Sequence, residues 1–194
     1  MPWVKDFDEE VVVDRAMKVF WAKGYEATSI SDLVDAMQIN KGSLYNAFGS
    51  KKALFTRALL KYDREFRQGA LEELEALDSP LLAIRTLFDS LIEESRADKQ
   101  RKGCLLVNTA LDLPNQSADI QGMVSSALRD FESFFRRSIK LGQKRGEVAA
   151  GLDADETAKW LLAQVVGLRV LARGTFDVAG LRAIRSQTLH HLAA

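Results

Sequence analysis

The residues best suited to binding phosphate are concentrated in one short part of the chain. Residues 41–62 contain five basic side chains and no carboxylate, whereas residues 1–40 contain four basic and eight acidic ones. The whole chain is neutral, with 27 basic and 27 acidic residues, but a phosphate backbone responds to a local basic patch. This segment therefore indicates nucleic-acid binding. Its basic residues are Lys41, Lys51, Lys52, Arg57 and Lys61.

Residues that could perform covalent or metal chemistry are scarce. Cys104 is the one cysteine, and the two histidines, His190 and His191, are adjacent. Helix neighbours point about 100° apart, so this pair does not form a chelate. We find no Gly-rich phosphate loop, nucleophile elbow or HExxH motif. We therefore predict no enzyme activity, no cofactor and no metal site, and we interpret Cys104 as a small buried residue or, alternatively, as a redox sensor.

The elements that must position the basic side chains are predicted to be helices. The chain of 194 residues is 47% apolar and has 12 Gly and 3 Pro, which favours an all-α fold over a turn-rich sheet fold. Apolar periodicity predicts helices over residues 8–23, 30–37, 41–48 and from 51 to about 62. The predicted N-caps are Asp8, Thr28 or Ser29, Asn40 and Ser50.

The second and third of these helices have the proportions of a helix-turn-helix unit. They are short, a three-residue turn joins them, and they follow a longer helix on which they can pack. Leu44 and Phe48 would form the buried face of the third helix. Its outward face would enter the major groove of DNA, which accepts an α-helix. That face would carry Lys41, Ser43, Tyr45, Asn46 and Ala47.

Two segments closely resemble the N-terminal domain of TetR-type transcriptional regulators. They are FWAKGYEATSISDL at residues 20–33 and INKGSLYNAFGSKKALF at residues 39–55. The resemblance implies a DNA-binding domain over residues 1–62, with the helix-turn-helix at about 29–48, and an effector-binding and dimerisation domain over 63–194. It further implies an all-α homodimer, in which each subunit places its third helix in the major groove.

The resemblance also implies which residues contact DNA. Thr28 and Ser29 would touch phosphate at the start of the second helix, and Gly42 would permit close approach at the start of the third. Lys41, Ser43, Tyr45 and Asn46 would face the groove, and Lys51 would clamp the backbone. Lys52 stands beside Lys51 at the predicted start of the fourth helix. Helix N-termini favour phosphate on physical grounds as well. The chain departs from the family pattern at Ala47, where a polar group is usual, and in its acidic N-terminus, where Lys5 is the one basic residue.

The second half of the chain predicts five more helices, which makes about nine in all. They cover residues 80–96, 103–111, 117–145, 153–173 and 177 to about 192. The resemblance implies that the last two helices form the homodimer. Apolar and aromatic residues of this half are candidates for lining an effector cavity. These candidates are Phe88, Leu91, Cys104, Val107, Phe131, Phe135 and Trp160.

Together these observations predict a ligand-responsive regulator, most often a repressor in such families, released from a near-palindromic operator by a small lipophilic or aromatic effector. The alternative is a helical homodimer that binds a small molecule or a protein partner without binding DNA. No apolar run approaches the roughly 20 residues of a membrane span. Residues 1–6 lack the basic start and apolar core of a signal peptide, so we expect a cytoplasmic protein.

Overall fold

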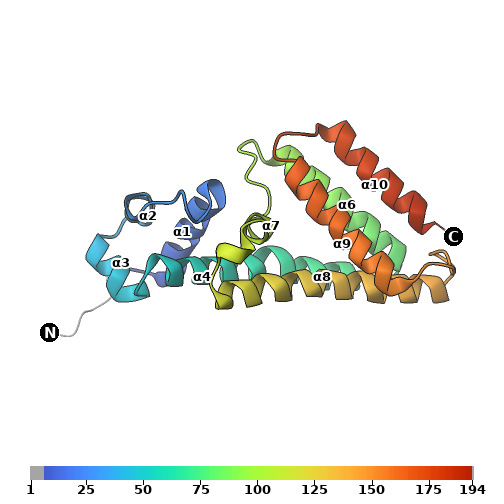
Figure 1. Ribbon diagram of the computed structural model, residues 1–194, viewed down its shortest axis with the longest axis horizontal. Coiled ribbons are helices and arrows are strands. Elements are labelled where there is room, and N and C mark those ends of the chain that lie inside the picture. The colour runs from blue at the N-terminus through green and yellow to red at the C-terminus, as the bar shows by residue number, and fades with distance from the viewer. Residues whose placement is uncertain (1–6, 194) are drawn as a thin grey trace.

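The structure, a computed structural model, describes residues 7–193 as an all-α chain (Figure 1), which confirms the predicted fold class. Its helices are α1 (Glu9–Lys23), α2 (Ile30–Met37), α3 (Lys41–Phe48), α4 (Lys51–Tyr62), a π-helix (Asp63–Gln68), α5 (Gly69–Glu75), α6 (Pro80–Ala97), α7 (Leu105–Ala110), a 3₁₀ turn (Leu113–Asn115), α8 (Ala118–Lys144), α9 (Ala154–Leu171) and α10 (Val178–Leu192). The predictions about residues 1–6, including the lack of a signal peptide and of a basic tail at Lys5, lie outside the described residues.

The helices form an elongated molecule with a small unit at one end and a larger bundle at the other. Helices α1 to α3 lie at the first end, and α6, α9 and α10 lie at the second (Figure 1). Helices α4 and α8 run along the long axis between them (Figure 1). Within residues 7–193, no helix is long and apolar enough to cross a membrane.

The helix ends at the small unit follow the predicted capping chemistry. The Asp8 carboxylate accepts from the backbone amides of Glu10 and Val11, at 2.9 and 3.4 Å. Asn40 accepts from the amide of Ser43 at 2.8 Å, and Ser50 from that of Ala53 at 3.0 Å. The choice between Thr28 and Ser29 is settled in favour of Ser29, which forms a capping box with Asp32. Local polar side chains thus fix where helices α1 to α4 begin.

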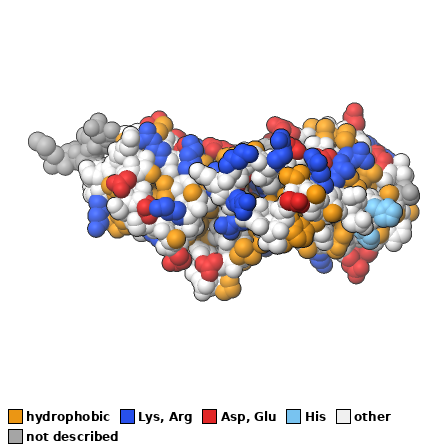
Figure 2. All heavy atoms as spheres, turned by 90° about the horizontal axis from the view of Figure 1, so that it is seen from above, with side chains coloured by type: hydrophobic (Ala, Val, Ile, Leu, Met, Phe, Trp, Pro, Cys, Tyr) orange, Lys and Arg blue, Asp and Glu red, His pale blue; other side chains and the backbone are white. Residues whose placement is uncertain are grey.

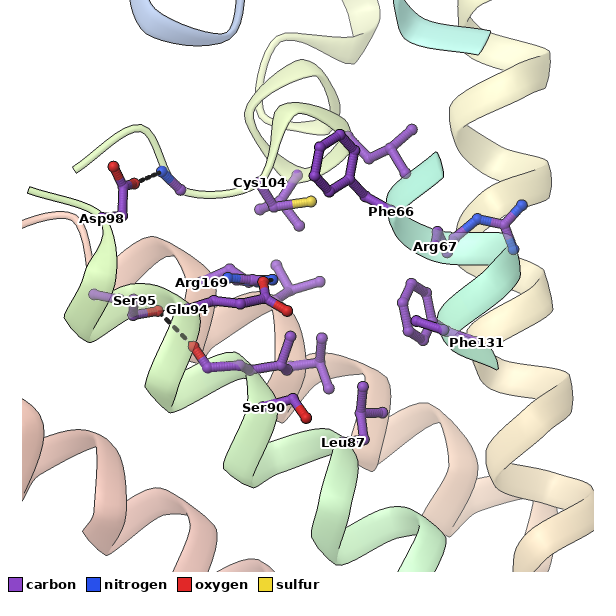
Figure 3. A pocket seen from close by; sticks show the side chains of 18 of the residues that line it. Phe66, Arg67, Leu87, Ser90, Glu94, Ser95, Asp98, Cys104, Phe131 and Arg169 are labelled. Atoms are coloured by element: carbon purple, nitrogen blue, oxygen red, sulfur yellow. Dashed lines mark hydrogen bonds and ion pairs between the residues drawn. The ribbon is translucent and has the colours of Figure 1, made fainter. Parts of the chain in front are cut away.

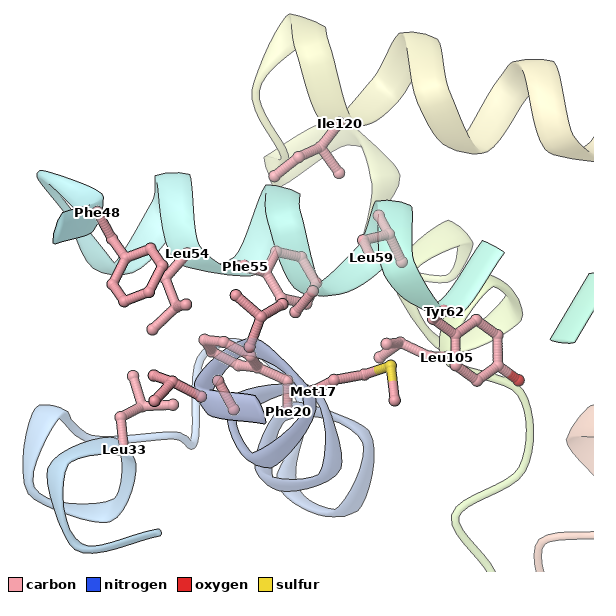
Figure 4. Packing of buried hydrophobic residues seen from close by; sticks show 14 of the residues in the cluster. Met17, Phe20, Leu33, Phe48, Leu54, Phe55, Leu59, Tyr62, Leu105 and Ile120 are labelled. Atoms are coloured by element: carbon pink, nitrogen blue, oxygen red, sulfur yellow. The ribbon is translucent and has the colours of Figure 1, made fainter. Parts of the chain in front are cut away.

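The small unit shares its apolar core with the rest of the chain. Phe20 of α1 meets Phe55 of α4 edge to face, with ring centroids 4.9 Å apart. The same cluster continues through Leu59 into Leu105 of α7 and Ile120 of α8 (Figure 4). The division at residue 62 that the sequence suggested therefore does not separate two independent cores. Because α4 packs against α7 and α8 in this cluster, a movement of either helix would displace α4.

Helix α4 continues past residue 62, where the apolar pattern no longer predicts a helix. The π-helix and α5 extend it to Glu75 as one rod, so the described residues hold nine separate helices besides the 3₁₀ turn. Arg67 and Asp63 are both buried in this extension and form a two-pronged ion pair, one bond of which, from Nη2 to Oδ2, is 2.7 Å long. Arg67 also donates to Asp130 of α8 at 2.9 Å. The extension is thus held by a buried ion-pair network, which has no apolar signature in the sequence.

A second apolar core lies in the bundle of α6, α8, α9 and α10. Phe88, Phe135 and Leu168 are fully buried there, and Phe134 and Phe135 pack at a centroid distance of 5.4 Å. The predicted helix over 103–111 is shorter than expected, because Gly103 takes a positive φ of 70° and Cys104 stands at the N-cap of α7. Residues 98–104 instead form an irregular segment between α6 and α7.

We predict that Phe55→Ala destabilises the whole protein, because the side chain is 1% exposed and contacts the rings of Phe20 and Tyr25. Loss of a buried phenylalanine costs about 3–5 kcal/mol of unfolding free energy. Urea unfolding followed by circular dichroism measures this loss. Leu60→Ala on the same helix is the control, since Leu60 is 52% exposed and its truncation should stay within about 0.5 kcal/mol. Equal losses for the two variants would contradict the proposed core.

Candidate nucleic-acid interface and effector cavity

Helix α3 presents a polar face to solvent. Leu44 and Phe48 are buried at 0% and 6% exposure, as predicted, and anchor α3 on the core of the small unit. Lys41, Tyr45 and Asn46 are exposed on the other side. The remaining predicted residues of this helix are Gly42, which is exposed, and Ser43, which is half-buried. A Cβ on residue 42 would lie 3.2 Å from Oδ1 of Asn40, so glycine suits the Asn40 cap. The face is free of carboxylates and rich in hydrogen-bonding groups.

The turn between α2 and α3 is fixed by a side chain of α1. Gln38 adopts the left-handed conformation, with φ of 57°. Arg15 donates through Nη1 to the carbonyl of Met37 at 3.2 Å and to Oε1 of Gln38 at 3.0 Å. A guanidinium at the C-terminus of α2 satisfies an unpaired carbonyl and complements the helix dipole. Arg15 therefore sets the angle between α2 and α3.

Thr28 has a different place from the one predicted. Its side chain is 1% exposed, and its hydroxyl donates to the carbonyl of Gly24 at 2.6 Å. The hydroxyl cannot reach a phosphate without breaking that bond, so Thr28 fixes the link between α1 and α2 instead. Ser29 is exposed, but its hydroxyl is engaged with Asp32, both as donor to the carboxylate at 2.8 Å and as acceptor from the amide at 3.0 Å.

The five basic residues of segment 41–62 are divided between two environments. Arg57 pairs with Glu9 at 3.2 Å, and Lys61 pairs with Glu10 at 3.2 Å and with Glu65 at 2.7 Å. The expectation that all five form one free patch is therefore wrong, since acids of α1 and of the π-helix neutralise these two. Within residues 7–193, the side chains of the other three have no carboxylate partner. The three are Lys41, Lys51 and Lys52.

Lys51 is held beside the link to α2 by an aromatic ring. Its Nζ lies 4.4 Å from the ring centroid of Tyr25, within the range of a cation–π contact. Burial, followed by the charge of Glu26, raises the pKa of Tyr25, so the ring carries no negative charge at neutral pH. Tyr25 therefore positions the ammonium group without neutralising it. Lys52, one residue further on, is exposed.

A cavity of about 710 Å³ is lined by the rod, by segment 98–104 and by helices α6 to α9, together with Trp21 of α1 (Figure 3). Four predicted effector-site residues line it, namely Leu91, Cys104, Val107 and Phe131. The other three do not. Phe88 and Phe135 are fully buried in the bundle core, and Trp160 packs against His191 of α10 with ring centroids 4.7 Å apart. Helical periodicity gave the apolar face of each helix correctly, but it does not show which apolar residues meet a void.

The cavity reaches the small unit through Trp21 of α1. The indole Nε1 donates to the carbonyl of Gly103 at 2.8 Å, and the Lys102 ammonium lies over the same ring at 4.4 Å. The ring also contacts Tyr62 and Phe66, at centroid distances of 5.0 and 5.3 Å. Trp21 thus contacts both the irregular segment 98–104 and the rod formed by α4, the π-helix and α5. The contact of Trp21 with the cavity could not be predicted from the sequence, because α1 lies far from residue 103 in the chain.

Polar side chains line one side of the cavity. Arg169 of α9 is ion-paired with Glu94 of α6 (Figure 3). Tyr62 lies close to Cys104 and Arg169, and burial, then the neighbouring Cys104, raises the pKa of the Tyr62 hydroxyl well above its usual value. Cys104 itself is half-buried in the cavity wall. Among the described residues, no group of three or more His, Cys, Asp or Glu side chains is placed to hold a metal ion.

The outward face of α3, the capped turn before it and the lysines beside it define a helix-turn-helix DNA-binding protein. Comparison with known families extends this. "Bacterial regulatory proteins, tetR family" matches residues 12–58, and "Tetracyclin repressor-like, C-terminal domain" matches residues 80–188, more than half of the chain. The chain belongs to the TetR family of transcriptional regulators, and so it is a DNA-binding regulator and not an enzyme.

Individual relatives agree with this assignment. The uncharacterized HTH-type transcriptional regulator YezE of Bacillus subtilis is 29% identical over 175 residues, which cover 90% of each chain. The HTH-type transcriptional repressor ComR of Escherichia coli is 29% identical over 186 residues, 95% of this chain and 89% of ComR. A solved structure of a cysteine mutant of the TetR family regulator CifR, complexed with 26-base-pair operator DNA, superposes with a TM-score of 0.83 at 29% identity, covering 97% and 98% of the two chains.

We predict that the Asp32 carboxyl of the capping box titrates at an unusually low pH. Hydrogen bonds from Lys23, at 2.5 Å, and from the backbone and hydroxyl of Ser29 lower its pKa from 3.8 to about 2. Because the folded pKa lies below the unfolded one, the stabilisation is complete above the unfolded value and is lost as the pH falls through about 2. An NMR titration of the side-chain carboxyl carbon should show this midpoint. Lys23→Ala should raise it, whereas Lys18→Ala, which removes a partner of Asp14, should leave it unchanged.

We also predict that Trp21→Phe loosens segment 98–104. The substitution keeps a ring in place but removes the donor to Gly103, a bond whose net value is about 0.5–1.5 kcal/mol. Protection of this segment from hydrogen exchange should therefore fall by roughly 2- to 12-fold. Mass spectrometry of peptides covering residues 98–107 measures the change. Trp160→Phe is the matched control, and equal protection in all three proteins would show that the indole bond does not hold the segment.

Proposed function

We propose that the chain is a ligand-responsive repressor that binds a near-palindromic operator as a homodimer and releases it when a small compound occupies the cavity. The observation that carries the DNA-binding part is the outward face of α3, where Lys41, Tyr45 and Asn46 are exposed while Leu44 and Phe48 anchor the helix. Such a helix enters the major groove, where amide and hydroxyl groups bond to base edges. This role places the protein with its DNA in the cytoplasm.

The proposed contacts divide into those that position the protein and those that read sequence. Lys51 and Lys52 stand at the N-terminus of α4, where backbone amides and positive charge favour a phosphate. A second phosphate contact is proposed at the exposed N-terminus of α2 through the backbone amides that follow Ser29, because the hydroxyl and amide of Ser29 already donate to Asp32. On α3, Asn46 and Tyr45 are assigned to base edges, with Lys41 and Ser43 at the start of the helix and Gly42 allowing close approach. Thr28 is left out of these contacts and supports the link before α2.

A homodimer through α9 and α10 supplies the second recognition helix. Two such helices must lie roughly 34–36 Å apart to enter successive major grooves on one side of the duplex. Ala163 is exposed on α9, and Gly167, one turn later, has open space where a Cβ would stand. Small residues at this spacing allow a partner helix to approach closely. This surface supports the assignment of the last two helices to the dimer.

The cavity is the proposed effector site, and Trp21 is the proposed link to DNA binding. A ligand that fills the space against Phe66 and segment 98–104 acts on the two elements that hold the Trp21 ring. It releases DNA to the extent that it binds better to the conformation with the wrong helix separation. Since the chain has a single cysteine, redox sensing through Cys104 would need a thiol from outside the subunit. We therefore assign the response to reversible ligand binding.

The test is a gel shift with DNA from the promoter region beside the chain's own gene. Lys51→Ala should weaken binding to every DNA sequence. It should also lower the magnitude of the slope of log K for DNA binding against log salt concentration by about 2, because each subunit of the dimer loses one phosphate contact. Asn46→Ala should instead reduce the preference for the operator over unrelated DNA by about 1–3 kcal/mol per half-site. Lys144→Ala is the charge-matched control, because Lys144 lies at the C-terminal end of α8, away from α3 (Figure 1).

Equal binding by the parent, Lys51→Ala and Asn46→Ala would contradict the proposed interface. Absence of any salt-sensitive specific complex, with a dimer still present in sedimentation, would favour the alternative of a helical homodimer that acts without DNA.

A further inference from the structure

We propose that the effector of the cavity is an amphiphilic anion, a compound with an aromatic or aliphatic body and one carboxylate or sulfonate that binds Arg169. This inference rests on the proposed function, because it concerns the same cavity, and it adds the charge and the polar anchor of the ligand.

Arg169 has guanidinium hydrogen-bond donors that residues 7–193 leave unused. Its side chain is 10% exposed and lines the cavity wall. A guanidinium group has five N–H donors in a planar fork that matches two oxygen atoms of a carboxylate. Among the described residues, Arg169 makes one hydrogen bond, from Nη2 to Glu94. A buried cation with spare donors beside a void is suited to accept an anion from the ligand.

The two partners of the Arg169–Glu94 ion pair differ in their exposure to solvent. The arginine side chain is 10% exposed, whereas that of Glu94 is 59% exposed. Glu94 can therefore turn into water at little cost, while Arg169 cannot leave the protein interior. An incoming carboxylate or sulfonate can take the place of Glu94 without leaving a buried charge unpaired. In the ligand-free protein, Glu94 acts as a substitute for the ligand's own acidic group.

Further basic side chains surround the cavity. Its lining includes Lys99, Arg101, Lys102 and Arg173, none of which has a carboxylate partner among residues 7–193. Lys and Arg side chains gather over the middle of the molecule when it is viewed from above (Figure 2). The one acid in this segment, Asp98, already accepts from the amide of Gly103 at 3.0 Å. Arg67, the other buried arginine of the lining, is neutralised by Asp63 and Asp130. Although Glu73 and Glu94 also belong to the lining, its basic side chains outnumber its acidic ones, which favours an anionic ligand.

The remaining wall is apolar and explains the body of the ligand. Phe66 is 48% exposed at the cavity, and Leu106, Leu128 and Phe131 complete the surface around it. Cavities of this kind orient a ligand through a few polar groups and hold it through apolar contact. A neutral apolar compound would fit the same space, but it would gain nothing from Arg169. Binding of an anionic ligand therefore depends on Arg169, whereas binding of a neutral ligand does not.

The experiment compares two fluorescent probes that share one ring system, anilinonaphthalenesulfonate and its sulfonate-free parent phenylnaphthylamine. Both are titrated into the full-length protein without DNA. Arg169→Gln should weaken binding of the sulfonate at least about 10-fold, the loss expected for one charge-assisted hydrogen bond, and change binding of the neutral probe less than about 3-fold. Glu94→Gln should strengthen binding of the sulfonate several-fold, because it removes the competing carboxylate.

The matched controls are Arg137→Gln and Glu75→Gln, which break an exposed ion pair between α8 and α5 outside the cavity. They should leave both probes unchanged. Equal effects of Arg169→Gln on the two probes, or unchanged sulfonate binding in Glu94→Gln, would overturn the proposal. If Arg169→Gln does not fold, the Glu94→Gln titration decides alone. Because no DNA is present, loss of the Arg169 dependence overturns the anion site only, whereas a failed gel shift overturns the proposed repressor.

Discussion

The position of the DNA-binding helices depends on burial that they cannot complete by themselves. Helix α4 supports α1 and α3 with Leu54 and Phe55, yet its last turns, at Leu59 and Tyr62, are covered by Leu105 of α7 and by α8. Removing that cover would expose apolar surface to water, at a free-energy cost of about 25 cal/mol for each Å². The α1–α4 unit is therefore not free to rotate on a linker. Its orientation is fixed by α7 and α8, which also contribute to the cavity lining.

Charge in this chain is distributed by the same constraint. The acidic first turn of α1 pairs with Arg57 and Lys61 on α4, which joins two helices of the core and removes two positive charges from the surface. The three lysines that remain uncompensated lie at the start of α3 and of α4. A neutral chain thus keeps a local positive surface where two helix dipoles also point outward. The net charge of zero does not show this local distribution.

The sequence predicted features that are set by local chemistry. Each cap at Asp8, Asn40 and Ser50 is decided within three residues, and the apolar faces of α2 and α3 repeat at the helical period, so both appear in the sequence. The cavity could not be predicted in the same way. Phe131 lines it and Phe135, one turn away, does not, although both are aromatic residues of one apolar face. The extension past Tyr62 was missed because it is held by the buried pair of Asp63 and Arg67, for which hydrophobic periodicity has no signal.

In the proposed mechanism, the location of the cavity limits how a ligand can control DNA binding. Shifting a two-state equilibrium from 1:99 to 99:1 requires about 5.5 kcal/mol of differential affinity. A single charge-assisted bond to Arg169 supplies about 1.5–3 kcal/mol, which is not enough even if all of it favours one state. The balance must come from apolar contact that also differs between the states, about 2.5 kcal/mol for each 100 Å². Phe66 and Trp21 provide such a surface, and they belong to the rod and to α1, the elements that carry α3. An effective ligand therefore combines the polar contact at Arg169 with apolar contact to Phe66 and Trp21, because these rings belong to the elements that support the DNA-binding helices.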